Sequence, residues 1–292
     1  MVAVCRLFGL SGGPERVSAT FWLLNAPDSL SDQSRREPDG TGVGAYDARR
    51  RPVVDKQPLA AYADHEFARE ARKIISRTFV AHVRYASTGD LTPRNTHPFQ
   101  LDDRLFAHNG VLEDLPALER ELGGDLARVQ GDTDSERFFA LITREIERCG
   151  DVGAGIAVAT RWVAEHLPLL SANFVLIDAS DLWALRYPDT HDLYVLERLP
   201  GGHGGNEPLE HSGQQRPDRM RVTSGMLADR PSVVVATERM DDDPGWRTLT
   251  SGELLHVAAD LTVSSDRIID HPPARPLSLA DLGQQAAASQ RG

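Results

Sequence analysis

Cysteine is scarce in this chain of 292 residues, which holds only Cys5 and Cys149. Two cysteines in such different settings predict neither a disulfide framework nor a zinc site built from thiolates. Basic residues are also few, because 32 lysines and arginines stand against 43 aspartates and glutamates, for a net charge of -11. A phosphate backbone is held mainly by a basic surface, so we expect no nucleic-acid partner.

Long hydrophobic runs are absent as well. No apolar stretch of the sequence approaches the roughly 20 residues that a membrane-spanning helix needs. The apolar start of the chain meets Arg6 too early for a secretory signal, and no cleavage-type pattern of small residues follows it. We therefore expect no membrane partner and a cytoplasmic location. The composition, 40% hydrophobic and 26% charged, is that of an ordinary globular protein.

Hydrophobic periodicity predicts the order of the elements. Short β-branched or aromatic runs predict strands over 5–10, 77–87 and 104–109, with turn-rich segments at 38–42 and 91–95 between them. Helical spacing predicts helices over 134–148, opened by an acidic turn, and over 152–166. Further strand-like runs follow near residues 173–177, 183–187, 193–196, 232–237, 254–258 and 262–264. Strands, two helices and then strands predict a layered α+β fold.

Two segments lack a core pattern. Residues 200–218 contain Gly201-Gly202-His203-Gly204-Gly205 and predict a flexible insert. The stretch 272–292, which contains Gln284-Gln285-Ala286-Ala287-Ala288, is expected to be a disordered tail. We therefore predict a single domain over residues 1–271, interrupted by the insert, and expect neither segment to carry the chemistry.

Five segments in the first half of the chain are polar where a structural strand or turn would not need to be. They are Cys5, residues 84–89 (Arg-Tyr-Ala-Ser-Thr-Gly), 95–99 (Asn-Thr-His-Pro-Phe), 108–110 (His-Asn-Gly) and 131–135 (Gly-Asp-Thr-Asp-Ser). Each has an ordinary structural explanation when it is taken alone. A buried cysteine is usually a small hydrophobe, an arginine can belong to a structural ion pair, Asn-Gly is often a hairpin turn, and an aspartate often caps a helix.

A metal site is the other chemistry these segments could suggest. His97 and His108 could form a pair with His82. No carboxylate or histidine stands at a recognisable ligand spacing, however, so we expect neither a metal nor another cofactor.

The combination and order of the five segments resemble class II, or N-terminal-cysteine, glutamine amidotransferases of the Ntn-hydrolase superfamily. The resemblance runs from Cys5 to about Glu136, with a fainter likeness at 236–238 (Ala-Thr-Glu) and 241–246 (Asp-Asp-Asp-Pro-Gly-Trp). The chain looks most similar to the stand-alone bacterial members and to the subunit of the yeast glutathione-degradation complex. Its Asp-Pro-Gly-Trp segment also resembles the γ-glutamyl amidohydrolases of ergothioneine biosynthesis. The resemblance implies a four-layer αββα sandwich, with two mainly antiparallel sheets between helix layers.

The resemblance also implies an activity, cleavage of the γ-amide of glutamine or of a γ-glutamyl small molecule through a Cys5 thioester. By the same resemblance the Asn109 side chain and the Gly110 backbone N–H stabilise the oxyanion. Each residue type suits its role: an activated thiolate is a strong nucleophile, and amide donors stabilise developing negative charge.

For the rest of the substrate, the resemblance implies that Arg84 binds the α-carboxylate and Asp134 the α-ammonium group. Ser87 and His97 would complete that pocket. A guanidinium can grip a carboxylate with two parallel hydrogen bonds, and a carboxylate suits an ammonium ion.

The leader Met1-Val2-Ala3-Val4 departs from the family pattern, because the nucleophile of this class uses its own α-amino group as the base. Three explanations stay open. Val4 could be encoded by a GTG start codon, which the preference for arginine over lysine and hence a GC-rich genome would favour. A four-residue propeptide could be removed by autoprocessing, or the chain could be inactive. We expect the active form to begin at Cys5.

Partners and alternative functions follow from the same residues. The chain ends too soon for a fused synthase, so any ammonia-accepting synthase is expected to be a separate subunit. A cysteine amidohydrolase of another acyl specificity, of the penicillin or bile-salt type, stays open, although an apolar acyl group needs neither Arg84 nor Asp134. A catalytically inactive or partner-dependent subunit with the same fold is the third possibility.

Overall fold

Two sheets form the centre of the protein, and the computed structural model describes residues 5–34, 40–58, 60–61, 65–84, 91–200 and 230–290. The first sheet has the strand order β13-β11-β12-β1-β6-β3-β4. Its strands are β1 (Arg6–Ser11), β3 (Gly40–Tyr46), β4 (Pro52–Gln57), β6 (Thr78–Arg84), β11 (Tyr194–Arg198), β12 (Ser232–Ala236) and β13 (Arg247–Thr248). Every pairing in this sheet is antiparallel.

The second sheet has the order β15-β14-β10-β9-β8-β7, and β16 pairs in parallel with β9. Its strands are β7 (Phe99–Leu101), β8 (Arg104–Leu112), β9 (Pro168–Ile177), β10 (Leu182–Arg186), β14 (Glu253–Val257), β15 (Val263–Arg267) and β16 (Arg275–Pro276). A separate pair joins β2 (Val17–Ser18) to β5 (Ile75–Ser76).

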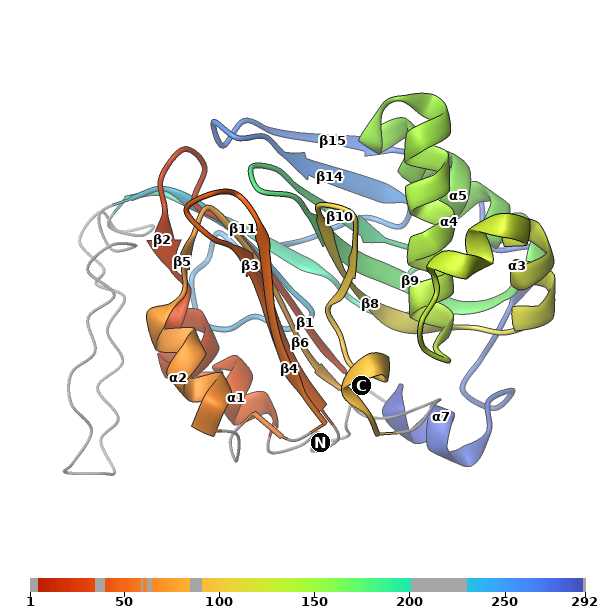
Figure 1. Cartoon of the computed structure of the whole chain (residues 1–292), viewed down its shortest axis with the longest axis horizontal. Helices are drawn as coiled ribbons and strands as arrows, with labels where there is room; N and C mark the ends of the chain where they lie inside the picture. The colour runs from red at the N-terminus through yellow and green to blue at the C-terminus, as the bar shows by residue number, and fades with distance from the viewer. Residues whose placement is uncertain are drawn as a thin grey trace.

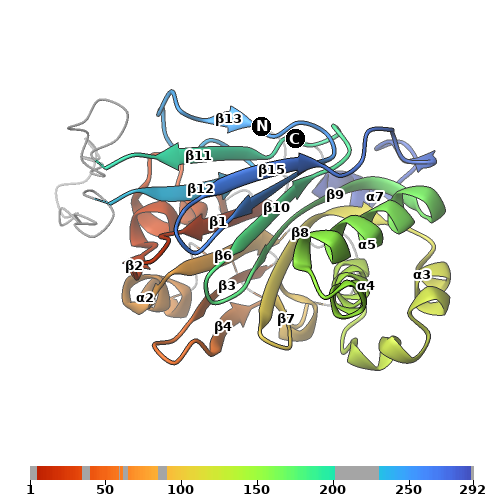
Figure 2. The ribbon, with the colours of Figure 1, turned by 90° about the horizontal axis from the view of Figure 1, so that it is seen from above.

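Helices cover the outer face of each sheet. The first sheet is covered by the π-helical turn η1 (Phe21–Asn25), α1 (Leu30–Gln33) and α2 (His65–Lys73). The second sheet is covered by α3 (Leu115–Leu122), α4 (Asp134–Cys149) and α5 (Val152–His166). Figure 1 shows the four layers side by side, and Figure 2 shows α4 and α5 lying over β8 and β9. Short 3₁₀ turns are η3 (Pro93–Asn95) and η4 (Gly123–Arg128), and α7 (Gln284–Ser289) lies near the end of the chain. The predicted α+β sandwich of the αββα type is confirmed.

Three apolar cores hold the layers together. The inner faces of the two sheets meet in a cluster that includes Leu7, Val80 and Val175. Trp22 and Phe67 belong to the core under the first helical layer, and Phe138 to the core under the second. Because the sheets are covered on both faces, polar side chains buried at strand ends require a local explanation.

The segment 38–42 was predicted as a turn, but β3 begins at Gly40 and runs through Gly42. A Cβ on Gly42 would lie 2.0 Å from the backbone oxygen of His97, so glycine is needed for this close approach. Glycines in a strand can mark such contacts as readily as turns. The turn prediction was therefore wrong for a physical reason.

The stretch 272–290 also differs from expectation. β16 pairs with β9, and Leu282 and Ala287 pack with Val111 and Leu170 in a small apolar cluster. Leucines and alanines spaced along a polar segment suffice to dock it, although they show no regular period. The predicted disordered tail is thus folded against the second sheet up to residue 290.

Some predictions fall on residues that the structure does not describe. Ser87 lies within 85–90, and most of the predicted insert lies within 201–229. None of the helices in the described part of the chain combines the length and the hydrophobicity that a bilayer span requires.

Candidate active site

The predicted site residues converge where strands of both sheets end beside the start of α4. Cys5 immediately precedes β1, and Arg84 is the last residue of β6. The register pairs Arg6 with Val83, so Cys5 and Arg84 lie at the same end of neighbouring strands. Gly110 in β8 and Asp134 at the start of α4 complete the convergence from the second half of the sandwich.

A small cavity of about 20 Å³ joins these side chains. Its lining includes five of the seven predicted residues, namely Cys5, Arg84, His97, Gly110 and Asp134. It also includes residues to which the sequence assigned no role, namely His82, His108, Thr133, Ser135 and Gln290. A space of this size holds about one water molecule, so the cavity is nearly filled by the protein itself.

Asn109 lies directly beside the predicted nucleophile. Its side-chain Nδ2 donates a hydrogen bond to the backbone oxygen of Cys5 over 3.0 Å, and both residues are buried. The alternative of an Asn-Gly hairpin turn is wrong, because Asn109 and Gly110 lie inside the continuous strand β8. A Cβ on Gly110 would lie 1.8 Å from the backbone oxygen of Ser171, which explains the glycine.

Asp134 is the first residue of α4 and not its cap. The cap is Thr133, whose Oγ1 accepts from the backbone N–H of Glu136 at 3.2 Å. The two carboxylate oxygens of Asp134 accept from the backbone N–H groups of Leu112, at 2.9 Å, and Ser135, at 2.8 Å. Asp134 is therefore a buried carboxylate with a fixed orientation at the edge of the cavity.

Three histidines line the same cavity and are held neutral. Burial lowers the pKa of His82 to about 3, and it lowers the pKa of His97 well below its ordinary value. Burial also lowers the pKa of His108, against the opposing charge of Asp134. His108 Nε2 lies 3.3 Å from the carbonyl oxygen of Ser171, which can only accept, so Nε2 carries the proton and Nδ1 accepts from the Ser135 hydroxyl at 2.9 Å. Arg84 thus lies among rings that add no positive charge.

These buried histidines predict a loss of stability in acid. A neutral buried histidine takes up its proton on unfolding, so the unfolded state binds more protons and the free energy of unfolding falls as the pH drops below about 6.5. For His82 this window extends down to its folded-state pKa of about 3. In His82→Leu, the dependence of the unfolding free energy on pH should be smaller by about 1.4 kcal/mol per pH unit within that window. Urea unfolding from about pH 6 to about pH 4 measures the slope.

The control for this prediction is the exposed His166, for which a His166→Gln variant should leave the slope unchanged. An unchanged slope in His82→Leu would mean that His82 is protonated in the folded protein.

A family model for class II glutamine amidotransferases matches residues 4–274. The chain belongs to this family. It is 29% identical over 314 residues to the Saccharomyces cerevisiae protein named "Probable glutamine amidotransferase DUG3", with 92% of this chain and 84% of that protein covered. It is 27% identical over 267 residues to the γ-glutamyl-hercynylcysteine sulfoxide hydrolase of Mycolicibacterium smegmatis, with 87% of this chain and 96% of that protein covered.

Solved structures agree on the fold. The glutamine phosphoribosylpyrophosphate amidotransferase of B. subtilis superposes with a TM-score of 0.62 at 20% identity, over 92% of this chain and 50% of that one. The chain thus spans about half the length of that protein. The predicted class II family and its Ntn-hydrolase fold are confirmed.

Two loops of this class II amidotransferase are joined to each other beside the cavity. The side chain of Asn95 accepts from the backbone N–H of Asp132 at 2.9 Å and donates to its carboxylate at 3.3 Å. Lys56 donates to the backbone oxygens of Thr96, at 2.9 Å, and Pro98, at 3.2 Å. These bonds fix the loop that carries His97. Asn95 and Asp132 therefore belong to the scaffold of the site.

The segment 236–238 of this amidotransferase fixes the strand that follows Cys5. Thr237 exchanges hydrogen bonds with the backbone of Leu7, at 3.2 Å and 3.1 Å. The carboxylate of Glu238 pairs with the buried guanidinium of Arg6 at 2.6 Å. Trp246, from the second segment of fainter likeness, instead packs edge-on against Trp22 in the core under α1 and α2. The first segment therefore holds the strand that follows Cys5, and the second supports the fold.

A second cavity of about 400 Å³ lies on the far side of Asn109. Its lining carries charges of both signs. The positive side chains are Arg6 and Arg239, and the negative ones are Asp189, Asp192 and Glu238. The cavity is thus large enough for a small organic group and is strongly polar.

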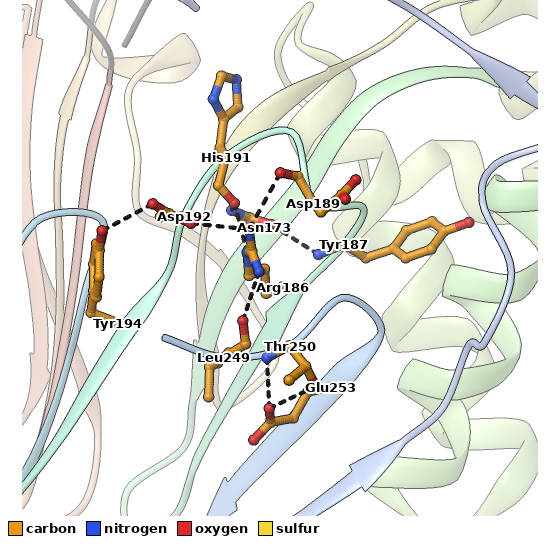
Figure 3. A network of polar contacts seen from close by, with 10 residues as sticks. All are labelled: Asn173, Arg186, Tyr187, Asp189, His191, Asp192, Tyr194, Leu249, Thr250 and Glu253. Atoms are coloured by element: carbon orange, nitrogen blue, oxygen red, sulfur yellow. Dashed lines mark hydrogen bonds and ion pairs between the residues drawn. The ribbon is translucent and has the colours of Figure 1, made fainter. Parts of the chain in front are cut away.

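Residues 189–192 form one wall of the second cavity and are held by a polar network (Figure 3). The backbone oxygen of His191 accepts from Asn173 Nδ2, at 3.1 Å, and from Arg186 Nε, at 2.9 Å. Arg186 also pairs with Asp192 at 3.0 Å. The wall is therefore a fixed part of the scaffold.

The sequence carried a usable signal for some of the residues that were not assigned a role. His82 shares a face of β6 with Arg84, and His108 shares a face of β8 with Gly110, so the strand period could have placed both at the site. Gln290 gave no such signal, because it follows a polar stretch without a period. Among the described residues, no group of three histidine, cysteine, aspartate or glutamate side chains is arranged to hold a metal ion.

Proposed function

We propose that this amidotransferase, in the form that begins at Cys5, hydrolyses the γ-amide of glutamine or of a γ-glutamyl compound through a Cys5 thioester. One observation carries the proposal: Cys5, Arg84, Gly110 and Asp134 come from four separate segments and line one buried cavity. A cation and an anion beside a thiol match the α-carboxylate, the α-ammonium and the γ-amide of a free γ-glutamyl group. An apolar acyl group would use neither charge.

The proposed reaction proceeds in two halves. The thiol proton of Cys5 passes to its own α-amino group, and Sγ bonds to the γ-carbonyl carbon to give a tetrahedral oxyanion, which Asn109 and the Gly110 N–H stabilise. The C–N bond then breaks, and the amine leaves with a proton. Water attacks the thioester, the C–S bond breaks, and glutamate is released as the thiol is restored.

The second cavity supports a leaving group larger than ammonia. Asn109 lines that cavity, while its neighbour Gly110 and Cys5 line the first. A substrate whose carbonyl lies at Asn109 would direct its γ-glutamyl part into the first cavity and its amine part into the second. Among relatives, the name of the Mycolicibacterium smegmatis hydrolase gives it a γ-glutamyl substrate with a large amine part.

A substrate panel tests the proposal. Protein that begins at Cys5 is incubated with glutamine, γ-glutamyl amino acids and γ-glutamyl peptides, and released ammonia, amine and glutamate are measured. We expect release from at least one γ-glutamyl amide and none from penicillin or a conjugated bile salt. The Cys149→Ala variant, which changes the exposed cysteine, should retain the activity. Hydrolysis of an apolar acyl amide alone would favour the other acyl specificity, and no release from any amide would favour an inactive or partner-dependent subunit.

Transfer of ammonia to a separate synthase subunit and a cytoplasmic location remain predictions from the sequence.

A further inference from the structure

Gln290, whose side chain carries a carboxamide, lines the cavity of the predicted nucleophile together with Cys5, Arg84 and Asp134, and 1% of the residue is exposed. A carboxamide is also the reacting group of glutamine. The chain therefore carries, in its own C-terminal segment, the functional group on which the proposed function acts.

The segment that carries Gln290 is docked by apolar contacts of limited extent. Leu282 and Ala287 pack with Val111 and Leu170, and Leu277 joins the same cluster. Val111 directly follows Gly110, so the docking point adjoins the cavity. Figure 1 shows α7 at the lower edge of the molecule, the edge at which β6 ends. Such a small cluster can hold a short segment and can also release it.

Gln290 is also close to the wall of the second cavity. Burial lowers the pKa of His191, and the side chain of Gln290 is near enough to oppose this shift. The backbone of His191 is fixed by Asn173 and Arg186 (Figure 3). Gln290 thus lines the cavity of Cys5 and also contacts His191, which lines the second cavity.

With Gln290 in place, the cavity of about 20 Å³ holds about one water molecule, and a substrate needs more room than that. We therefore expect Gln290 to move before substrate binds beside Cys5. Gln290 lies within the chain, so it presents neither a free α-carboxylate to Arg84 nor a free α-ammonium group to Asp134. A free γ-glutamyl compound has both and can displace it.

We propose that residues 284–290 form an internal plug, in which Gln290 fills part of the cavity beside Cys5 and competes with substrate for it. The identity of the competing substrate rests on the proposed function. The plug itself concerns only whether small molecules can reach Cys5. A competing segment lowers the fraction of protein that can bind, and the apparent dissociation constant of the substrate rises in inverse proportion to that fraction.

Alkylation by iodoacetamide tests the plug without any reference to hydrolysis. We expect Cys5 to be alkylated at least about tenfold faster in Gln290→Ala, and in a chain that ends at Gly283, than in the parent protein. A tenfold increase is the result expected if the plug occupies the site about nine-tenths of the time in the parent protein. The exposed Cys149 in the same molecule should react at an unchanged rate. Gln284→Ala, a change of an exposed glutamine in the same helix, should behave as the parent. Equal Cys5 rates in all four proteins would overturn the proposal.

Kinetics with the preferred amide of the panel give the second readout. In Gln290→Ala and in the truncated chain, KM should fall about tenfold with kcat unchanged. A higher KM would overturn the proposal, because Gln290 would then be part of the substrate site. Faster alkylation together with no amide hydrolysis by any of the proteins would leave the plug standing and refute the proposed function. Circular dichroism of each variant identifies any change that merely unfolds the protein.

Discussion

Protein that begins at Cys5 is expected to hydrolyse its γ-glutamyl amide, and the same protein with residues 1–4 in place is expected to be inactive. An N-terminal α-amino group has a pKa near 8 and can take the thiol proton, whereas a peptide nitrogen at the same position cannot. A general base is typically responsible for about 100-fold to 10,000-fold of the rate, so loss of activity by about that factor should follow from the leader alone. Two proteins, one released from a fusion so that Cys5 is first and one with the leader intact, allow the comparison by ammonia release.

Cys5→Ala in the processed form separates the thiol from the amino group. It keeps the α-amino group and removes the nucleophile, so activity should fall by about a millionfold, to the limit of detection. The matched variant Cys149→Ala changes the other cysteine, which is exposed, and should leave the rate unaltered. Full activity with the leader attached would exclude the α-amino group of Cys5 as the base, and residual activity in Cys5→Ala would exclude its thiol as the nucleophile.

Much of this fold could be predicted because its strands and helices follow simple periods. The helix predicted over 134–148 is α4, Asp134–Cys149, and the one predicted over 152–166 is α5, Val152–His166. The strand pair β3 and β4 was missed. β3 carries Gly40, Gly42 and Gly44, whose place in the strand depends on close contacts with residues distant in the sequence, such as His97. Local propensity cannot register such contacts.

The candidate site, like the fold, could be predicted from the sequence only in part. Cys5, Arg84, Gly110 and Asp134 were selected by their order along the chain, and folding brings them to one cavity. The resemblance selected residues but could not describe their surroundings. That His82, His97 and His108 are neutral follows from burial, and burial is a property of the assembled layers. The contribution of Gln290 depends on the docking of a segment that no period marks, through contacts with Val111 and Leu170, which are more than 100 residues away in the sequence.

Asn109→Ala is expected to lower kcat by about 100-fold to 1000-fold, or about 3 to 4 kcal/mol, with little change in KM. The side-chain amide of Asn109 lies beside Cys5, with its Nδ2 3.0 Å from the backbone oxygen of that residue, and we expect it to donate to the oxyanion that forms on the substrate carbonyl when Sγ attacks. Asn109→Asp has nearly the same shape but offers a negative charge in place of the donor, and it should be at least as damaging. Steady-state kinetics with the preferred amide measure both variants.

Asn173 provides the matched control, because it is a buried asparagine paired with Asn109 across the neighbouring strand. Its side chain donates to the backbone oxygen of His191 and accepts from the backbone N–H of Tyr187, so its role is structural. Asn173→Ala should reduce the free energy of unfolding by about 1 to 3 kcal/mol, as expected when buried backbone groups lose their partners. It should reduce kcat far less than Asn109→Ala does. If the two variants lost kcat in proportion to their loss of stability, Asn109 would be a scaffold residue like Asn173. The Gly110 N–H would then stabilise the oxyanion without help from Asn109.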